Sequence, residues 1–150
     1  MSPDFKDLLS AFNAHGVEYL VVGAHALAAH GHVRATKDLG VWVRPSEENA
    51  TRVLHALGAF GAPLQDLSVA DLAHPGLIFQ IGVPPVRIDV LTAIDGVEFA
   101  PAWLERMEAR FAGLAVPVLS RRDLIRNKRA CGRLQDMADV ERLEGGPPAE

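Results

Sequence analysis

The stretch TKDLGVWV, residues 36–43, decides how the rest of the chain is interpreted. As a β-strand it places three branched apolar residues on one face, and that face belongs to the core. The other face carries Asp38 and, two residues later, Gly40. Glycine in a strand interior costs roughly 0.5–1 kcal/mol relative to alanine. Gly40 therefore needs a specific reason, and the face it shares with Asp38 is the first place to look for function.

The composition is that of an ordinary globular protein, with 150 residues of which 49% are apolar and 23% charged. We expect one domain over residues 1–144 and a flexible tail over 145–150, where glycine and proline dominate. No apolar run approaches the length of about 20 residues that spans a bilayer, and the N-terminus does not resemble a signal peptide. These features predict a cytoplasmic protein that makes no contact with membranes.

Charge and cysteine content exclude further classes. The net charge of −4 argues against a general nucleic-acid binder, which would usually be basic. The single cysteine, Cys131, excludes an intramolecular disulfide and a cysteine-built zinc site. We interpret Cys131 as structural.

Caps, turns and hydrophobic periodicity predict the elements. Helices are expected over residues 3–15, 23–31, 47–57, 69–74, 121–132 and 134–143. Strands are expected over residues 17–22, 36–43, 77–82, 86–91, 107–113 and 114–120. Strands and helices alternate at first and strands then come in neighbouring pairs, so the fold class is α/β with a mixed sheet flanked by helices.

A second acidic strand position lies in VRIDVLT, residues 86–92, where Asp89 shares a face with Arg87. If this strand is a neighbour of residues 36–43, Asp38 and Asp89 can converge at one end of the sheet. Two close carboxylates repel unless a proton or a metal ion relieves them, and Mg²⁺ prefers such oxygen ligands. The alternative is that each aspartate only ends a strand or caps a loop.

The order of these parts resembles the nucleotidyltransferase superfamily of the polymerase-beta type. The resemblance rests on a strand leading to Gly23 at a helix start, then HGHVRATKDLG, then RIDVLT and LSRRDLIRNKRA. It covers nearly the whole chain and is nearest to a small bacterial branch related to abortive-infection nucleotidyltransferase toxins. It implies a nucleotidyltransferase-like mixed sheet, with Asp38 and Asp89 as the catalytic, metal-binding carboxylates and Gly23-Ala24 at the phosphates.

Two positions depart from the pattern of that family. Family members carry aspartate where this sequence has Gly40, and glycine or serine where it has Ala24. Loss of one carboxylate predicts weakened catalysis. Alanine still allows a phosphate to approach the helix start, but it supplies no hydroxyl group.

Three cations are further candidates for binding the nucleotide. The resemblance implies that Arg34 and Lys37 meet a triphosphate, although loop cations are often merely solvated. Lys128 lies at helical spacing on an inward-facing stripe with Leu124 and Ile125. Such a lysine either extends its charge out to water or reaches a buried anion, and we favour the site carboxylates or a bound phosphate.

The opposite stripe of that helix carries Arg122, Arg126, Arg129 and Arg133. A solvated face is the ordinary interpretation; an RNA, an acidic partner or the acidic residues of the last helix could also meet it. The histidines at 25, 30 and 32 lack the i, i+4 spacing of a helical metal site, so zinc is not expected.

The primary hypothesis is Mg²⁺-dependent transfer of a nucleoside monophosphate from a nucleoside triphosphate to a hydroxyl group, with Mn²⁺ as a possible substitute. The acceptor would be a protein, an RNA or a small molecule. The alternative is a catalytically degenerate member of the fold that acts as a nucleotide- or protein-binding module, comparable to a component of a toxin–antitoxin pair.

Overall fold

The computed structural model describes residues 2–33, 36, 38–82 and 86–145. Its elements, in chain order, are α1 (Pro3–Ala14), β1 (Tyr19–Val22), α2 (Gly23–Ala29), β2 (Asp38–Val43), α3 (Glu47–Phe60), α4 (Val69–Leu72), β3 (Ile78–Ile81), β4 (Arg87–Leu91), α5 (Phe99–Leu104), β5 (Met107–Phe111), β6 (Leu114–Val118), α6 (Arg121–Cys131) and α7 (Leu134–Glu144). Residues 83–85, which connect two of the expected strands, lie outside the described residues, as do Arg34, Lys37 and most of the expected tail.

In the described part of the chain, six strands form one sheet in the order β3-β4-β2-β1-β6-β5. β1 is antiparallel to β2 and parallel to β6, whereas β2 is parallel to β4. The outer pairs β3–β4 and β5–β6 are antiparallel. The sheet is therefore mixed, which confirms the predicted α/β fold class.

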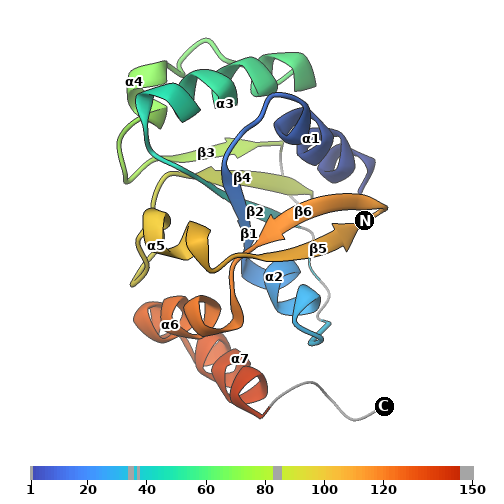
Figure 1. Ribbon diagram of the computed structural model, residues 1–150, viewed down its shortest axis with the longest axis vertical. Coiled ribbons are helices and arrows are strands. Elements are labelled where there is room, and N and C mark those ends of the chain that lie inside the picture. Colours follow the sequence, from blue (N-terminus) through green and yellow to red (C-terminus); the bar gives the residue numbers. More distant parts are fainter. Residues whose placement is uncertain (1, 34–35, 37, 83–85, 146–150) are drawn as a thin grey trace.

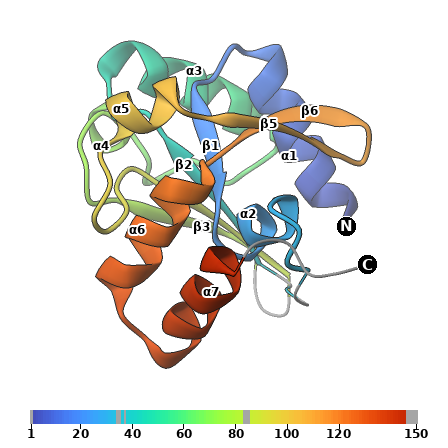
Figure 2. The same cartoon turned by 60° about the horizontal axis from the view of Figure 1, so that its bottom comes forward.

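Helices cover both faces of this sheet (Figure 1). α1 and α3 pack on one face with α4 beside them, and their fully buried residues include Leu8, Phe12, Val53 and Leu57. α2 and α5 lie on the other face, and α6 and α7 form a helical pair beyond them (Figures 1 and 2). The amphipathic spacing of α1 and α3 buries one stripe of each against the apolar face of β2.

Asn49 connects α3 to the far ends of β1 and β2. Its side chain accepts a hydrogen bond from the Glu18 amide at 2.8 Å and donates to the carbonyls of Glu18 and Arg44 at 3.0 and 3.1 Å. The residue is only 2% exposed. A buried amide that satisfies three backbone groups holds the segment before β1 and the segment after β2 against the start of α3.

Several element boundaries differ from the sequence-based prediction by one to three residues, and two of them are informative. β1 begins at Tyr19 rather than at Val17. α3 passes its predicted end at Leu57, includes Gly58, and ends at Gly61, whose φ of 98° is readily adopted by glycine. A single glycine near the end of a helix is tolerated when the next glycine provides the left-handed cap.

The short helix α5 was not predicted. Its residue Phe99 packs against Trp42 of β2, with ring centroids 4.9 Å apart, and stacks on Trp103 at 5.7 Å. Helices this short are marginal on their own. Tertiary packing against Trp42 accounts for an element that has too few residues to show periodicity.

Among the described residues, no helix is long and apolar enough to traverse a bilayer.

Candidate functional site

The end of β1 and the beginning of β2 lie side by side. Val22 pairs with Gly40 in the antiparallel register, and Gly23 follows immediately with a φ of 70° and begins α2. Glycine adopts this left-handed conformation without strain. The chain can therefore turn from strand to helix within one residue, next to the Asp38 end of β2.

β2 and β4 are parallel neighbours, as the convergence of the two carboxylates requires. Asp38 lies opposite Arg87 and Gly40 opposite Asp89 in this pairing. Because residues paired across a sheet share a face, all four lie on the same face. The tertiary structure thus gathers Asp38 and Asp89 at one end of the sheet, beside Gly23.

Arg87 bridges the two carboxylates. Its Nε lies 3.0 Å from Asp89 Oδ1, and its Nη2 lies 3.3 Å from Asp89 Oδ2 and 3.6 Å from Asp38 Oδ2. The side chains are partly exposed, by 30% for Arg87, 21% for Asp89 and 50% for Asp38. Sequence reasoning placed Arg87 on the face of Asp89 but assigned it no function.

The contact between Arg87 and Asp89 is close but poorly aligned. Arg87 Nε and Asp89 Oδ1 are both buried, and neither makes a well-aligned hydrogen bond to a described residue. Their 3.0 Å separation is therefore mainly an electrostatic contact. Asp89 Oδ1 retains unused capacity to bind a donor or a cation.

Gly40 leaves a space that Val22 partly fills. A Cβ added at Gly40 would lie 3.1 Å from the Val22 Cγ2 methyl group and 3.8 Å from the Val22 carbonyl oxygen. Gly40 lies within β2 and adopts no left-handed conformation. The packing of Val22 on β1 therefore explains the glycine at this position, and a turn conformation does not.

Glu48 does not replace the missing carboxylate. It lies in the first turn of α3, beyond the other end of β2, and its Oε1 binds Arg52 Nη2 at 2.8 Å. Among the described residues, no three histidine, cysteine, aspartate or glutamate side chains gather where they could hold a metal ion.

Asp38 and Asp89 nevertheless fit Mg²⁺ as part of a shared site. In proteins Mg²⁺ is usually bound by one or two carboxylates, and phosphate and water oxygens complete its six ligands. The unaligned Asp89 Oδ1 and the half-exposed Asp38 carboxylate supply two such oxygens. An ion bound there would lie close to Arg87, and the two cations would repel each other.

Lys128 faces inward, as predicted, but the strand carboxylates are not its partners. Its Nζ lies 2.9 Å from Asp139 Oδ2 and 3.7 Å from Asp136 Oδ1, both on α7. Lys128, Asp136 and Asp139 are at most 5% exposed. The expectation that Lys128 reaches Asp38 or Asp89 is corrected, because the packing of α6 on α7 supplies nearer buried anions. Its contact with a nucleotide stays a prediction.

The predicted arginine stripe is exposed, but only Arg122, Arg126 and Arg129 belong to α6, since Arg133 is the N-cap of α7. Arg129 Nη2 lies 2.6 Å from Glu144 Oε2, and Arg133 Nε lies 2.7 Å from Asp136 Oδ2. Burial alone would raise the pKa of Asp136, but its bond to Arg133 and the charges of Arg133 and Lys128 outweigh burial and lower it. Arg129 thus links α6 to α7 at the surface, and Lys128 links the two helices in the interior.

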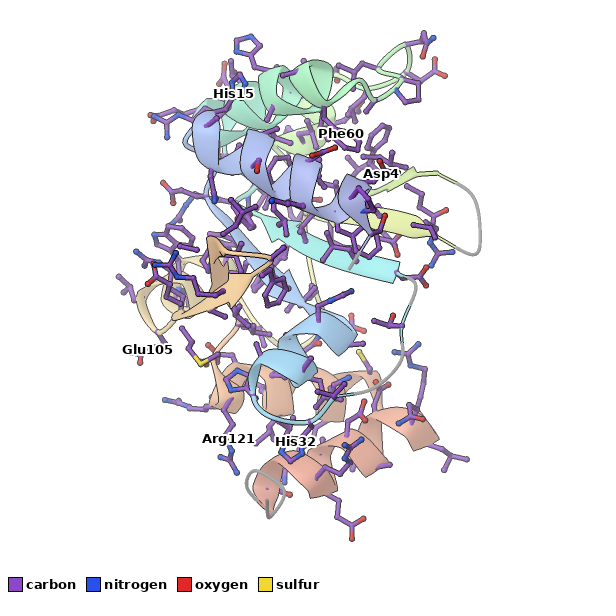
Figure 3. The ribbon with its side chains drawn as sticks, turned by 90° about the vertical axis from the view of Figure 1, so that its right-hand side faces the viewer. Asp4, His15, His32, Phe60, Glu105 and Arg121 are labelled. Atoms are coloured by element: carbon purple, nitrogen blue, oxygen red, sulfur yellow. The ribbon has the colours of Figure 1, made fainter. Side chains whose placement is uncertain are left out.

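The histidines have separate surroundings. His30 Nε2 lies 2.8 Å from the Leu119 carbonyl oxygen and links α2 to the end of β6. His32 is buried and lies between α2 and the pair of last helices (Figure 3). His25 contacts the rings of Phe5 and Phe111, with centroids 5.5 and 5.9 Å away, and burial lowers its pKa.

A hollow of about 950 Å³ adjoins the site. It lies between α2, the beginning of α1 and β5, and its lining includes Phe5, His25, Phe111, Ala24, Thr36 and Val86. The last three connect it to the site, since Ala24 follows Gly23, Val86 precedes Arg87, and the Thr36 hydroxyl accepts a bond from the Asp38 amide at 3.2 Å. Its volume lies within the range of small-molecule sites.

Comparison with known proteins identified similar folds. No family model and no curated protein matches the chain. Among solved structures, the lincosamide antibiotic adenylyltransferase LnuA, bound to lincomycin, superposes with a TM-score of 0.61 at 12% identity, over 96% of each chain.

Two further solved structures have a similar fold. ANT(2'')-Ia in complex with adenylyl-2''-tobramycin has a TM-score of 0.59 at 17% identity, covering 93% of this chain and 84% of its own. A protein of Thermotoga maritima described as a nucleotidyltransferase has a TM-score of 0.57 at 14% identity, covering 94% and 88%. At these identities the likeness concerns the fold. The chain has the fold of the nucleotidyltransferases.

Proposed function

We propose that the protein binds a nucleoside triphosphate with Mg²⁺ and transfers the nucleoside monophosphate to a hydroxyl group, with activity weakened by Gly40. The observation that carries this proposal is the gathering of Asp38 and Asp89 on one sheet face beside the Gly23 turn. The fold shared with LnuA and ANT(2'')-Ia supports it. Function nevertheless depends on the site and not on the fold alone.

In this proposal each residue has a defined task. Asp38 and Asp89 hold the ion, which would neutralise charge on the phosphates when bound. The Gly23-Ala24 turn seats the phosphate groups, and Arg34 and Lys37 neutralise their charge. The acceptor oxygen forms a bond to the α-phosphorus, pyrophosphate leaves, and Asp89 takes the hydroxyl proton.

The missing carboxylate sets the expected level of activity. Two unit charges 4 Å apart interact by about 4 kcal/mol at an effective dielectric near 20. Loss of that amount from transition-state stabilisation would reduce the rate by about a thousandfold. Water or phosphate oxygens at the vacant position would offset part of this loss.

The hollow favours a small molecule as the acceptor. It adjoins the site through Ala24, Thr36 and Val86 and is lined by the rings of Phe5, His25 and Phe111. The lincomycin of LnuA and the adenylyl-2''-tobramycin of ANT(2'')-Ia show that similar folds accommodate small organic ligands. We propose that the hollow receives the organic body of the acceptor.

A second candidate is a binding module that retains the fold without catalysis. Gly40 and the Arg87 bridge favour it, because together they leave the two carboxylates paired with a protein cation. Such a protein would bind a nucleotide or a protein partner.

Calorimetric titration with ATP, CTP, GTP and UTP, each with and without Mg²⁺, tests the proposal. We expect at least one nucleotide to bind more tightly with Mg²⁺, and Asp38→Ala to abolish that gain. Asp66→Ala, an exposed aspartate outside the site, is the matched control and should bind normally. If none of the four nucleotides binds, the proposed function is wrong, and the second candidate, a module that binds a protein partner, is favoured.

A further inference from the structure

We propose that Arg87 is the resident cation of the site and couples metal binding to nucleotide binding. This inference rests on the proposed function, because it assigns a partner to Arg87 when a triphosphate is bound. Without nucleotide, Arg87 occupies the carboxylates and excludes a divalent cation. A triphosphate draws the guanidinium group away and frees Asp38 and Asp89 for the ion.

The first argument is the position of the guanidinium group. Three contacts of 3.0 to 3.6 Å join it to both carboxylates. Mg²⁺ binds its oxygen ligands at about 2.0–2.1 Å, so an ion on these carboxylates would lie close to the guanidinium group. The two cations would repel each other. The dication alone therefore binds weakly while Arg87 keeps these contacts.

The second argument is that the Arg87 contacts are easy to exchange. Arg87 Nε and Asp89 Oδ1 are buried but lack an aligned hydrogen bond, and the contact with Asp38 is the longest, at 3.6 Å. A pair that makes only part of its hydrogen bonds gains less from its own association than an aligned one. The side chain is also 30% exposed, which leaves it room to turn.

The third argument is the preference of arginine for phosphate. A guanidinium group binds phosphate oxygens through two parallel hydrogen bonds. A carboxylate pair that holds a metal ion is a poorer partner for the guanidinium group than a phosphate is. Only β2 separates β4 from β1, whose end carries the Gly23 turn. The long side chain of Arg87 thus begins close to where the phosphates are proposed to lie.

Coupling of this kind is reciprocal. If nucleotide strengthens metal binding by removing Arg87, metal must strengthen nucleotide binding by the same factor. A site with only two carboxylates would in this way bind the ion and the nucleotide together and neither of them tightly alone.

Titration with Mn²⁺, followed by the magnetic-resonance signal of the free ion, provides the test. Without nucleotide, Arg87→Gln should bind Mn²⁺ about tenfold or more tightly than the unaltered protein, a factor typical of coupled sites. Adding Asp38→Ala to Arg87→Gln should remove this gain. Arg52→Gln, the same substitution on exposed α3, should leave Mn²⁺ affinity unchanged.

The second titration repeats the Mn²⁺ measurement in the presence of the nucleotide analogue α,β-methylene-ATP. The unaltered protein should bind Mn²⁺ about tenfold more tightly when the analogue is present, and Arg87→Gln should show much weaker coupling. Equal Mn²⁺ affinity of the unaltered protein and Arg87→Gln without nucleotide would overturn the inference. If no nucleotide binds, the proposed function fails, whereas the Mn²⁺ comparison still decides whether Arg87 excludes the ion.

A measurement on the unaltered protein covers the case in which Arg87→Gln fails to fold. The Nε–Hε resonance of Arg87 should shift when Mg²⁺ and the analogue are both added and stay in place with Mg²⁺ alone. An identical response to Mg²⁺ alone would contradict the exclusion.

Discussion

Gly40 is explained at the scale of single residues by its neighbour on β1. A Cβ at this position would lie 3.1 Å from the Val22 methyl group, closer than the optimal separation of about 3.5–4.0 Å between carbon atoms. The backbone itself accepts any residue here, since Gly40 is in ordinary strand conformation. A side chain can therefore be restored if Val22 moves by a few tenths of an ångström.

We predict that Gly40→Asp increases the affinity for Mn²⁺ together with nucleotide. The gain should be at least about tenfold, because one more carboxylate at ligand distance adds several kcal/mol of attraction even at an effective dielectric near 20. Calorimetric titration of the variant and the unaltered protein measures it. The new carboxylate would extend from the same face as Asp38 and Asp89.

Gly40→Ala is the matched control for this prediction. It introduces the same contact with Val22 without a carboxylate, so both variants should show a similar change in the free energy of unfolding. Only Gly40→Asp should gain metal affinity. Equal metal affinities of the two variants would mean that restoring the carboxylate at position 40 does not restore a metal site. That result would favour the binding module.

At the scale of elements, the pair α6–α7 depends on a buried charge. Lys128 contacts Asp139 and Asp136 at 2.9 and 3.7 Å, and all three are almost fully buried. Removal of one partner from a buried ion pair leaves an uncompensated charge, which is much more costly than the net value of the pair. The cluster thus specifies how α6 packs on α7.

We predict that Lys128→Met reduces the free energy of unfolding by about 3–5 kcal/mol, because the variant loses the buried cation that contacts both Asp139 and Asp136. Urea unfolding monitored by circular dichroism measures the change. The double variant Lys128→Met with Asp139→Leu should recover much of the loss, because it removes the buried carboxylate nearest to Lys128 together with the cation. A loss below about 1 kcal/mol for Lys128→Met would show that the cluster contributes little.

At the scale of the whole molecule, the cluster also makes stability depend on pH. The pKa of Asp136 in the folded protein is below its ordinary value, chiefly through Arg133 and Lys128 acting against burial. A carboxyl group with a depressed folded pKa stabilises the fold above its unfolded pKa of about 3.9, and this contribution is lost as pH falls through the folded value. Acid should therefore weaken the fold.

We predict that Asp136→Asn flattens this acid dependence. The free energy of unfolding of the unaltered protein should decrease between about pH 5 and pH 2, and the variant should decrease less over the same interval. At pH 7 the variant should be the less stable of the two. Urea unfolding at a series of pH values measures both curves, and parallel curves would contradict the assignment.

The candidate site is built from several layers of the fold. The sheet lies between the α3 side of the molecule and the α6–α7 pair (Figures 1 and 2). Asp38 and Asp89 share one face of this sheet. The hollow at the beginning of α2 adjoins this face through Thr36 and Val86. The two carboxylates, the Gly23 turn and the hollow are thus contributed by segments distant in sequence.

The sequence by itself determined what depends on local chemistry. Strand alternation placed Asp38 and Asp89 on polar faces, and the capping serines Ser46 and Ser120 located the starts of α3 and α6. The inward face of Lys128 followed from helical periodicity. These features could be predicted because period, caps and turns involve residues within a few positions of each other.

Only the tertiary structure decided which of these residues meet. The Arg87 bridge, the Val22 methyl group beside Gly40 and the pairing of Lys128 with α7 each join positions that no local pattern relates. Packing also stabilised α5, which is too short to form by propensity alone. Charge contacts depend on which strands and helices become neighbours, and that is set by the burial of the whole apolar core.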